Sequence, residues 1–435
     1  MDQDRTISAP RDQALLDQAW THPLFEALYG RRSRRFGLGF EIAEGPFRYR
    51  SRHAPVPLDE FEEALLVGAG TGVSGIPLWD GIRPPASRGG DGRTFGSAAQ
   101  GRRTALFFTP DRGVYVIDPA AATASKLTEI ETRDERQRVL ALYRQHCKQL
   151  ADGRLAIARR VPPLFGHNMW NCNMPGTTLF MPVCDVSLAL ISLILNLVDG
   201  EAGRYVHGHG GGMNIIDDRR GGCPAGTEPW LARGLVDREK LLPLSILERQ
   251  ACYFMFSEPA VICHNIFLAT EAMGLGGWMH CGFLSLQVMQ ALGFRMVGGA
   301  DQQAGANPVG LDGVFEGFCP PYFPSMDAAV DAALARISHA RASEEQPYTM
   351  TQSEYRDAIS RAPSDAGLAC TKAVCRYIHE TYGRFPASVD TMHLMWFMQA
   401  HHLDPDYYRR FFHSGALGPT HAAHMAAWHG DAAAR

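Results

Sequence analysis

The run from His264 to Phe294 has the clearest pattern of apolar and polar positions in the chain. Its first half carries apolar residues at helical spacing, and Gly274 follows where a helix would end. A short apolar stretch comes next, and the tripeptide 281–283, Cys-Gly-Phe, opens a second run with helical spacing. The pattern predicts a helix, a glycine turn, a short strand and a second helix. We call residues 281–282, between the predicted strand and the second helix, the join. A glycine at the join lets a flat ligand approach the main chain, and the start of a helix leaves N–H groups free to hydrogen-bond that ligand.

Other segments predict both helices and strands. Residues 57–66 form an amphipathic helical pattern, and two β-rich runs between 104 and 130 flank a Pro-Asp-Arg-Gly turn. The most apolar run, Val186 to Val198, is too short to span a bilayer, so we expect a buried or interface helix. Helical patterns also cover 326–341, 367–386 and the Met-rich, aromatic stretch 390–412.

A glycine-rich run at 67–75 does not fit a dinucleotide fingerprint. That fingerprint needs a strand before the glycines and a helix after them, whereas here a predicted helix precedes and Pro77 follows closely. We therefore exclude a Rossmann domain.

A cationic cluster lies near the N-terminus. Arg31, Arg32, Ser33 and Arg35 follow a short helical pattern that starts at Leu24. Guanidinium forks together with a hydroxyl donor suit a phosphate dianion. The alternative is a solvated cationic cap favoured by the helix dipole. The sequence thus offers one candidate anion site.

These two regions together resemble the FMN-dependent nitroreductase superfamily. The pattern N-x-x-L-A-x-E-A-x-G-L-G begins at Asn265, and R-R-S-x-R begins at Arg31. The resemblance implies that the 31–35 cluster holds the FMN phosphate and ribityl chain, and that the N–H of Gly282 lies near flavin N5. Cys281 occupies the place often held by a glutamate. We accordingly take Cys281 and Gly282 as candidate catalytic and cofactor-binding residues.

The loop and hairpin after position 92 are similar to one branch of this superfamily, the azoline-forming dehydrogenases of the streptolysin S type. Carried over from that branch, Arg93, Ser97 and Ala98 are further FMN contacts, and Ser74 is a competing one. The resemblance implies an α+β, nitroreductase-like fold with a mainly antiparallel sheet flanked by helices. It also implies a homodimer with FMN at the subunit interface.

The resemblance leaves two regions unexplained and divides the chain into four parts. The nitroreductase-like domain consists of two halves, residues 1–153 and residues 249–334. Between them we expect an insertion, residues 154–248, that acts as a lid or substrate wall. The chain ends with a helical extension, residues 335–435. Within the insertion, the candidate substrate-binding residues are Asn171, Asn173, His207 and His209. Uncharged donors and acceptors of this kind suit a polar substrate, although asparagine clusters are also common turn formers.

Composition narrows the classes of function. The chain has 20% charged residues and a net charge of −4, which gives no basic excess for nucleic acid. Its N-terminal segment is polar and lacks the apolar core of a secretory signal, so we expect a cytoplasmic protein with no membrane partner and with reduced cysteines. We expect no metal site, because no carboxylate or cysteine near the histidines completes one in the local sequence.

Three functions remain open. The first is an FMN-dependent oxidoreductase of the dehydrogenase or oxidase type, which transfers hydride through flavin N5 and acts on a small biosynthetic or peptide-derived substrate. The second is an NAD(P)H-dependent reductase of nitro, quinone or enone compounds. The third is a non-catalytic binding subunit that keeps the nitroreductase fold.

Overall fold

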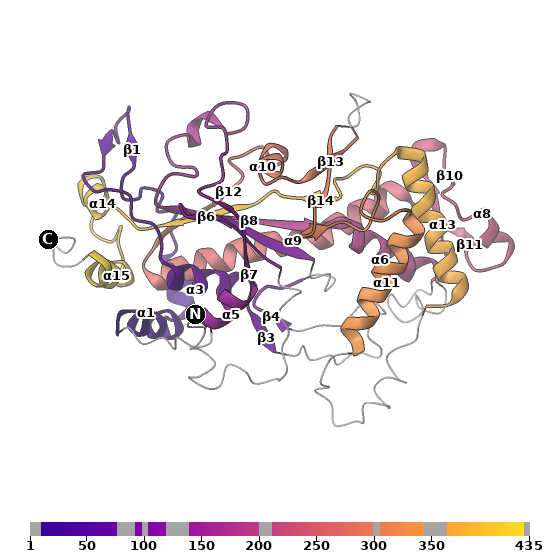
Figure 1. Ribbon diagram of the computed structural model, residues 1–435, viewed down its shortest axis with the longest axis horizontal. Coiled ribbons are helices and arrows are strands. Elements are labelled where there is room, and N and C mark those ends of the chain that lie inside the picture. Colours follow the sequence, from indigo (N-terminus) through magenta and orange to yellow (C-terminus); the bar gives the residue numbers. More distant parts are fainter. Residues whose placement is uncertain are drawn as a thin grey trace, which may run out of the picture.

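The computed structural model of the protein describes residues 10–75, 92–97, 103–118, 139–199, 211–298, 305–342 and 363–429. Helices surround a largely antiparallel sheet (Figure 1), so the predicted α+β class is confirmed. Ala98, His207 and His209 lie outside the described residues.

The main sheet has the strand order β12, β17, β8, β5, β6, β7, and each neighbouring pair is antiparallel. These strands are β12 (Gly276–His280), β17 (Phe397–His401), β8 (Thr177–Asp185), β5 (Thr104–Thr109), β6 (Gly113–Ile117) and β7 (Cys147–Asp152), with β16 (Met392–His393) also paired to β8. Leu106 and Phe108 of β5 enter one apolar core, whereas Ala105 and Phe107 enter another. The middle of the sheet is therefore buried on both faces.

Helix α9 (Leu244–Met273) follows the long axis of the molecule (Figure 1). It packs against α3 (Glu60–Thr71), α6 (Val186–Val198) and the sheet. The helix ends at Gly274, whose φ of 79° places it in the left-handed region that favours glycine. By length and composition α9 could cross a membrane, but half of its most apolar window is buried in the protein. In this fold α9 serves as the central core helix.

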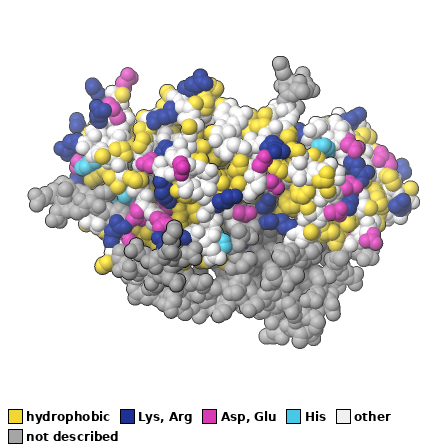
Figure 2. All heavy atoms as spheres, viewed as in Figure 1, with side chains coloured by type: hydrophobic (Ala, Val, Ile, Leu, Met, Phe, Trp, Pro, Cys, Tyr) yellow, Lys and Arg dark blue, Asp and Glu magenta, His cyan; other side chains and the backbone are white. Residues whose placement is uncertain are grey.

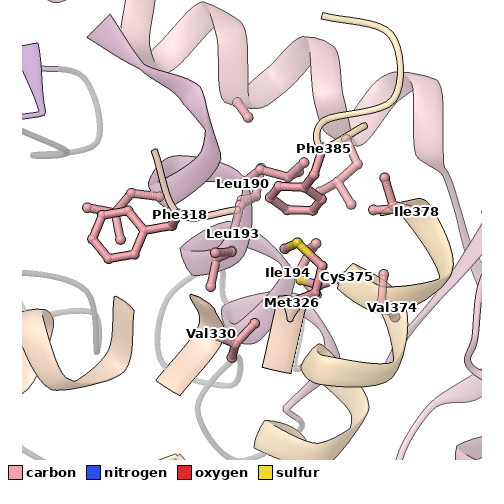
Figure 3. Close-up of a cluster of buried hydrophobic side chains, with 14 of the residues drawn as sticks. Leu190, Leu193, Ile194, Phe318, Met326, Val330, Val374, Cys375, Ile378 and Phe385 are labelled. Atoms are coloured by element: carbon pink, nitrogen blue, oxygen red, sulfur yellow. The ribbon is translucent and has the colours of Figure 1, made fainter. Parts of the chain in front are cut away.

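A second core lies at the end of the molecule away from β12 (Figure 1). There α6 packs with α11 (Met326–Ala342) and α13 (Asp365–Tyr382). Figure 3 shows the apolar side chains that meet between these helices, namely Leu190, Leu193, Ile194, Phe318, Met326, Val330, Val374, Cys375, Ile378 and Phe385. This core joins the expected insertion to the expected C-terminal extension.

The remaining helices are α1 (Pro10–Thr21), α2 (Leu24–Gly30), α5 (Val139–His146), η2 (Gly166–Asn168), η3 (Asp218–Arg220), α8 (Glu228–Ala232), α10 (Ser285–Ala291), α14 (Pro405–Phe411) and α15 (Pro419–His429). The remaining strands are β1 (Glu41–Ile42), β2 (Tyr49–Arg50), β3 (Val73–Gly75), β4 (Gly92–Arg93), β9 (Met213–Asp217), β10 (Cys223–Pro224), β11 (Asp237–Pro243), β13 (Arg295–Val297), β14 (Asn307–Leu311) and β15 (Phe315–Glu316).

Several predicted elements are confirmed. The run 264–294 forms the end of α9, a glycine turn, β12 and α10, and the predicted hairpin is formed by β5 and β6. The run 186–198 is the buried helix α6.

Two sequence interpretations differ from the structure. Residues 154–248, interpreted as an insertion, supply β8 in the middle of the main sheet and the first turn of α9. The helix predicted over 390–412 is wrong for its first half, which forms β16 and β17 before α14 begins at Pro405. Short apolar runs rich in methionine and aromatic residues suit a buried strand as well as a helix, so spacing alone did not separate the two.

Figure 2 shows basic and acidic side chains interspersed over the described part of one face of the molecule. This arrangement agrees with the small net charge and differs from the clustered basic patch of a nucleic-acid-binding surface.

Candidate functional site

The 31–35 segment lies against the edge strand β12. Arg34 and Gly277 form an isolated antiparallel bridge, and the Arg35 guanidinium carbon lies 5.4 Å from the centre of the Trp278 ring. Two motifs that are far apart in the sequence therefore meet at one edge of the sheet.

Arg34 anchors this contact, although the R-R-S-x-R pattern leaves its position unspecified. Its side chain is buried, and its Nη1 donates to Oε2 of Glu271 at 2.6 Å. Its Nε donates to the carbonyl oxygen of Ala416 at 2.7 Å. Burial raises the pKa of Glu271 while the Arg34 charge opposes that shift. The pair fixes the 31–35 segment to the end of α9.

The neighbouring cations are arranged differently. The Arg31 guanidinium carbon lies 4.8 Å from the centre of the Phe267 ring, and Arg32 donates to the carbonyl oxygens of Tyr29 and Arg31. The side chains of Ser33 and Arg35 are exposed. Within the described ranges, no carboxylate forms an ion pair with Arg31, Arg32 or Arg35. These three guanidinium groups keep the capacity to bind an anion.

Gly282 lies in a tight join after β12. It is buried, its N–H donates to Nδ1 of His280 at 3.0 Å, and its carbonyl accepts from the N–H of Phe165 at 3.0 Å. A Cβ added at this position would lie 2.9 Å from Nδ2 of Asn168 and 2.9 Å from Nδ1 of His280. The close approach of these two side chains requires glycine at this position, whereas the sequence led us to expect a flat ligand against it. The join differs from expectation in that α10 starts only at Ser285 and the Gly282 N–H is engaged inside the chain.

His280, the residue directly before Cys281, has a central position in the structure. Its ring stacks on Trp278 with a centroid separation of 4.0 Å and an interplanar angle of 19°. Burial, with a contribution from the Arg35 charge, lowers the pKa of His280 to about 3, so the ring is neutral at pH 7. Because Nδ1 accepts from Gly282, the proton of the neutral ring lies on Nε2. This buried Nε2 has no hydrogen-bond partner among the described residues.

Cys281 follows His280 and is exposed at the same join. Partial burial raises the pKa of its thiol, so the thiol stays protonated at neutral pH. A protonated thiol is a weak donor and a poor nucleophile.

The asparagine run beside the join separates into two kinds of residue. Leu164 forms an isolated bridge with Phe283, which places the following residues over Gly282. Asn168 and Asn171 are buried; among the described residues, Oδ1 of Asn168 and both polar side-chain atoms of Asn171 lack a partner. Asn173, in contrast, accepts from Arg154 at 2.8 Å and donates to the carbonyl of Leu155 at 3.0 Å. The hydrogen bonds of Asn173 thus stabilise the loop that contains it. Asn168 and Asn171 have buried polar atoms without a partner among the described residues.

Three of the other predicted cofactor residues are described in the structure, namely Ser74, Arg93 and Ser97. Ser74 and Arg93 belong to the β3–β4 pair, and the Ser97 hydroxyl donates to Glu258 at 2.5 Å. Glu258 and Glu271, the partner of Arg34, are thirteen residues apart on α9, which corresponds to about 20 Å along its axis. Ser97 and Arg34 therefore contact α9 at two points that lie about 20 Å apart.

No family model and no curated protein matches the chain. A solved structure that resembles it is that of a candidate nitroreductase from Ralstonia eutropha JMP134, with 13% sequence identity and a TM-score of 0.28. The likeness covers 63% of this chain and 76% of that chain. A likeness this weak carries no argument about function, which therefore has to be argued from the site.

Proposed function

We propose that the protein is an FMN-dependent oxidoreductase of the dehydrogenase or oxidase type. The observation that carries the proposal is the meeting of the 31–35 segment with β12, directly before the Cys281-Gly282 join. A phosphate-bearing, flat cofactor requires cations at one end and a backbone N–H within reach at the other. The 31–35 segment and Gly282 are the candidates for these two roles.

The phosphate end fits the residues present. Arg31, Arg32 and Arg35 form no ion pair with a carboxylate in the described part of the chain, and Ser33 offers an exposed hydroxyl. In this proposal these four residues bind the phosphate and ribityl chain of FMN. When bound, FMN supplies hydride transfer at N5, while the protein binds, orients and shields it.

Gly282 can contact the ring end of the cofactor on one condition. The Gly282 N–H donates to one acceptor at a time, so its contact with a cofactor requires release from Nδ1 of His280. Cys281, exposed beside this N–H, contacts the cofactor or substrate as a neutral thiol. Ser74, Arg93, Ser97 and Ala98 remain secondary proposals for cofactor contact.

We further propose a small biosynthetic or peptide-derived substrate, in line with the azoline-forming branch that the hairpin resembles. Asn171 would bind polar groups of the substrate, because its buried amide has no partner among the described residues. His207, His209 and Asn173 stay proposals of the sequence alone. A cytoplasmic homodimer with FMN at the subunit interface is likewise proposed.

One observation favours a second candidate, a non-catalytic subunit of this fold. The Gly282 N–H is engaged by His280, and Asn168 packs over the same residue. If this closed join does not open, the chain would bind a partner without turning over a flavin.

The visible spectrum of the purified protein separates these functions. The proposal predicts a yellow protein with the visible absorption bands of an oxidised flavin. A colourless protein that takes up no added FMN would contradict it. Stopped-flow reduction with NADPH then separates a dehydrogenase or oxidase, which nicotinamide should reduce slowly, from a nitro, quinone or enone reductase.

A further inference from the structure

Three buried side chains converge at a place remote in sequence from one another. Glu62 lies in the first turn of α3, His402 directly follows β17, and His424 lies on α15. Their relative exposures are 0%, 3% and 4%. Nε2 of His402 lies 3.0 Å from Oε1 of Glu62, and Nε2 of His424 lies 3.4 Å from the same oxygen.

These distances suit three ligands of one metal ion. Metal–nitrogen and metal–oxygen bonds of about 2.0–2.1 Å in a tetrahedral centre place the ligand atoms about 3.3 Å apart. The candidate ligand atoms here all lie within 4.8 Å of one another. Small side-chain rotations bring such a group into the required geometry.

Charge also favours a cation at this position. A fully buried carboxylate is costly unless it is compensated, and a neutral imidazole contributes no charge. The N–H of Asp59 donates to Oε2 of Glu62 at 2.9 Å, and Nε2 of His402 lies 3.0 Å from both oxygens of that carboxylate. The backbone contact therefore helps to hold the Glu62 carboxylate against the histidines.

We propose that Glu62, His402 and His424 bind a divalent transition metal ion, with Zn²⁺ as the natural occupant. Two imidazole nitrogens and one carboxylate oxygen form a ligand set that Zn²⁺ accepts, with a fourth position for water. Because the three ligands come from α3, the end of β17 and α15, the ion fastens the C-terminal helix to the sheet and to α3. Its role is structural, and it is independent of the proposed flavin chemistry.

The sequence did not predict this site because Glu62 lies far in the chain from both histidines. The fold brings Glu62 to them, although Glu62 and His402 are 340 positions apart. Folding therefore creates a ligand set that local spacing does not contain.

The test starts with the metal content of the full-length protein. Elemental analysis of protein purified without chelator should give about one zinc per chain. After chelation, titration with Co²⁺ should produce the visible d–d absorption of a tetrahedral centre at one equivalent, and one equivalent of Zn²⁺ should abolish it.

Variants then locate the ion. His424→Ala should weaken Co²⁺ binding more than 100-fold, since loss of an outer-shell partner alone costs 10–100-fold. His424→Cys should keep the ion and add a thiolate-to-cobalt charge-transfer band. His413→Ala, which removes an exposed histidine outside the cluster, should bind Co²⁺ as the parent does.

A parent protein with no zinc and no tetrahedral Co²⁺ spectrum would overturn the proposal. So would equal Co²⁺ affinity in the parent and His424→Ala, because the ion would then lie elsewhere. If His424→Ala fails to fold, His424→Cys decides the matter, since absence of the charge-transfer band would place the metal outside this cluster.

Discussion

Replacing Arg34 by methionine should strongly destabilise the protein. The Arg34–Glu271 pair has side-chain exposures of 6% and 8%, and the variant leaves the Glu271 carboxylate buried without its cation. Breaking a buried pair from one side costs about 3–5 kcal/mol. Loss of the bond from Arg34 to the carbonyl of Ala416 acts in the same direction. We expect a loss in this range for Arg34→Met.

Urea unfolding at pH 7, followed by circular dichroism, measures the effect as a shift in midpoint at constant slope. Arg376→Met is a matched control, because the Arg376–Asp327 pair is exposed to 49% and 41%. Surface pairs contribute about 0–1 kcal/mol, so the control should lose no more than that. Adding Glu271→Leu to Arg34→Met should restore part of the stability, because the uncompensated charge is removed.

A loss below about 1 kcal/mol in Arg34→Met would refute the reasoning, since the pair would then behave as a surface pair. Strict additivity of the two single substitutions in the double variant would also refute it, because it would show that the two side chains are not coupled.

Two further predictions concern the join. Burial lowers the pKa of His280 to about 3, below the value of about 6.5 in the unfolded chain. The unfolded state therefore takes up this proton first, and stability should fall as the pH drops below 6.5, by about 1 kcal/mol from this residue at pH 5.5. Urea unfolding at pH 7 and at pH 5.5 measures this loss of stability. His280→Gln should lose less stability between the two pH values than the parent does. An equal loss in both proteins would contradict the assignment to His280. Gly282→Ala should cost about 1–3 kcal/mol through its clash with Asn168 and His280. Gly96→Ala is the control, because no atom of the described residues lies within 4 Å of a Cβ at that position, and it should change the melting temperature little. Similar melting temperatures for the two variants would contradict the packing around Gly282.

The sequence predicted the parts of the fold that local patterns determine. The end of α9 follows from helical spacing and from the glycine at 274, and the β5–β6 hairpin follows from a turn between two β-rich runs. The place of β8 in the sheet could not be predicted, because pairing between distant strands leaves no local signal.

The candidate site was predictable in residue type and only partly in arrangement. R-R-S-x-R pointed to Arg31, Arg32, Ser33 and Arg35, but the buried anchor is Arg34, whose partner Glu271 lies far away in the chain. The hydrogen bond from Gly282 to His280 depends on the exact turn after β12, which spacing does not determine. Burial of Asn168 and Asn171 beneath distant segments likewise appears only in the folded chain.

The most direct test of the FMN site is a titration of the cofactor-free protein with FMN, followed by quenching of flavin fluorescence. The account predicts one FMN per chain and binding that weakens by about 10–100-fold in Arg35→Ala, the cost of losing one charge-assisted hydrogen bond of about 1.5–3 kcal/mol. Arg233→Ala removes a guanidinium that lies 4.9 Å from the centre of the Trp230 ring. Arg233 directly follows α8, which lies at the end of the molecule away from β12 (Figure 1), so this variant should bind FMN as the parent does. Absence of saturable FMN binding, or equal affinity in the parent and Arg35→Ala, would contradict the central claim.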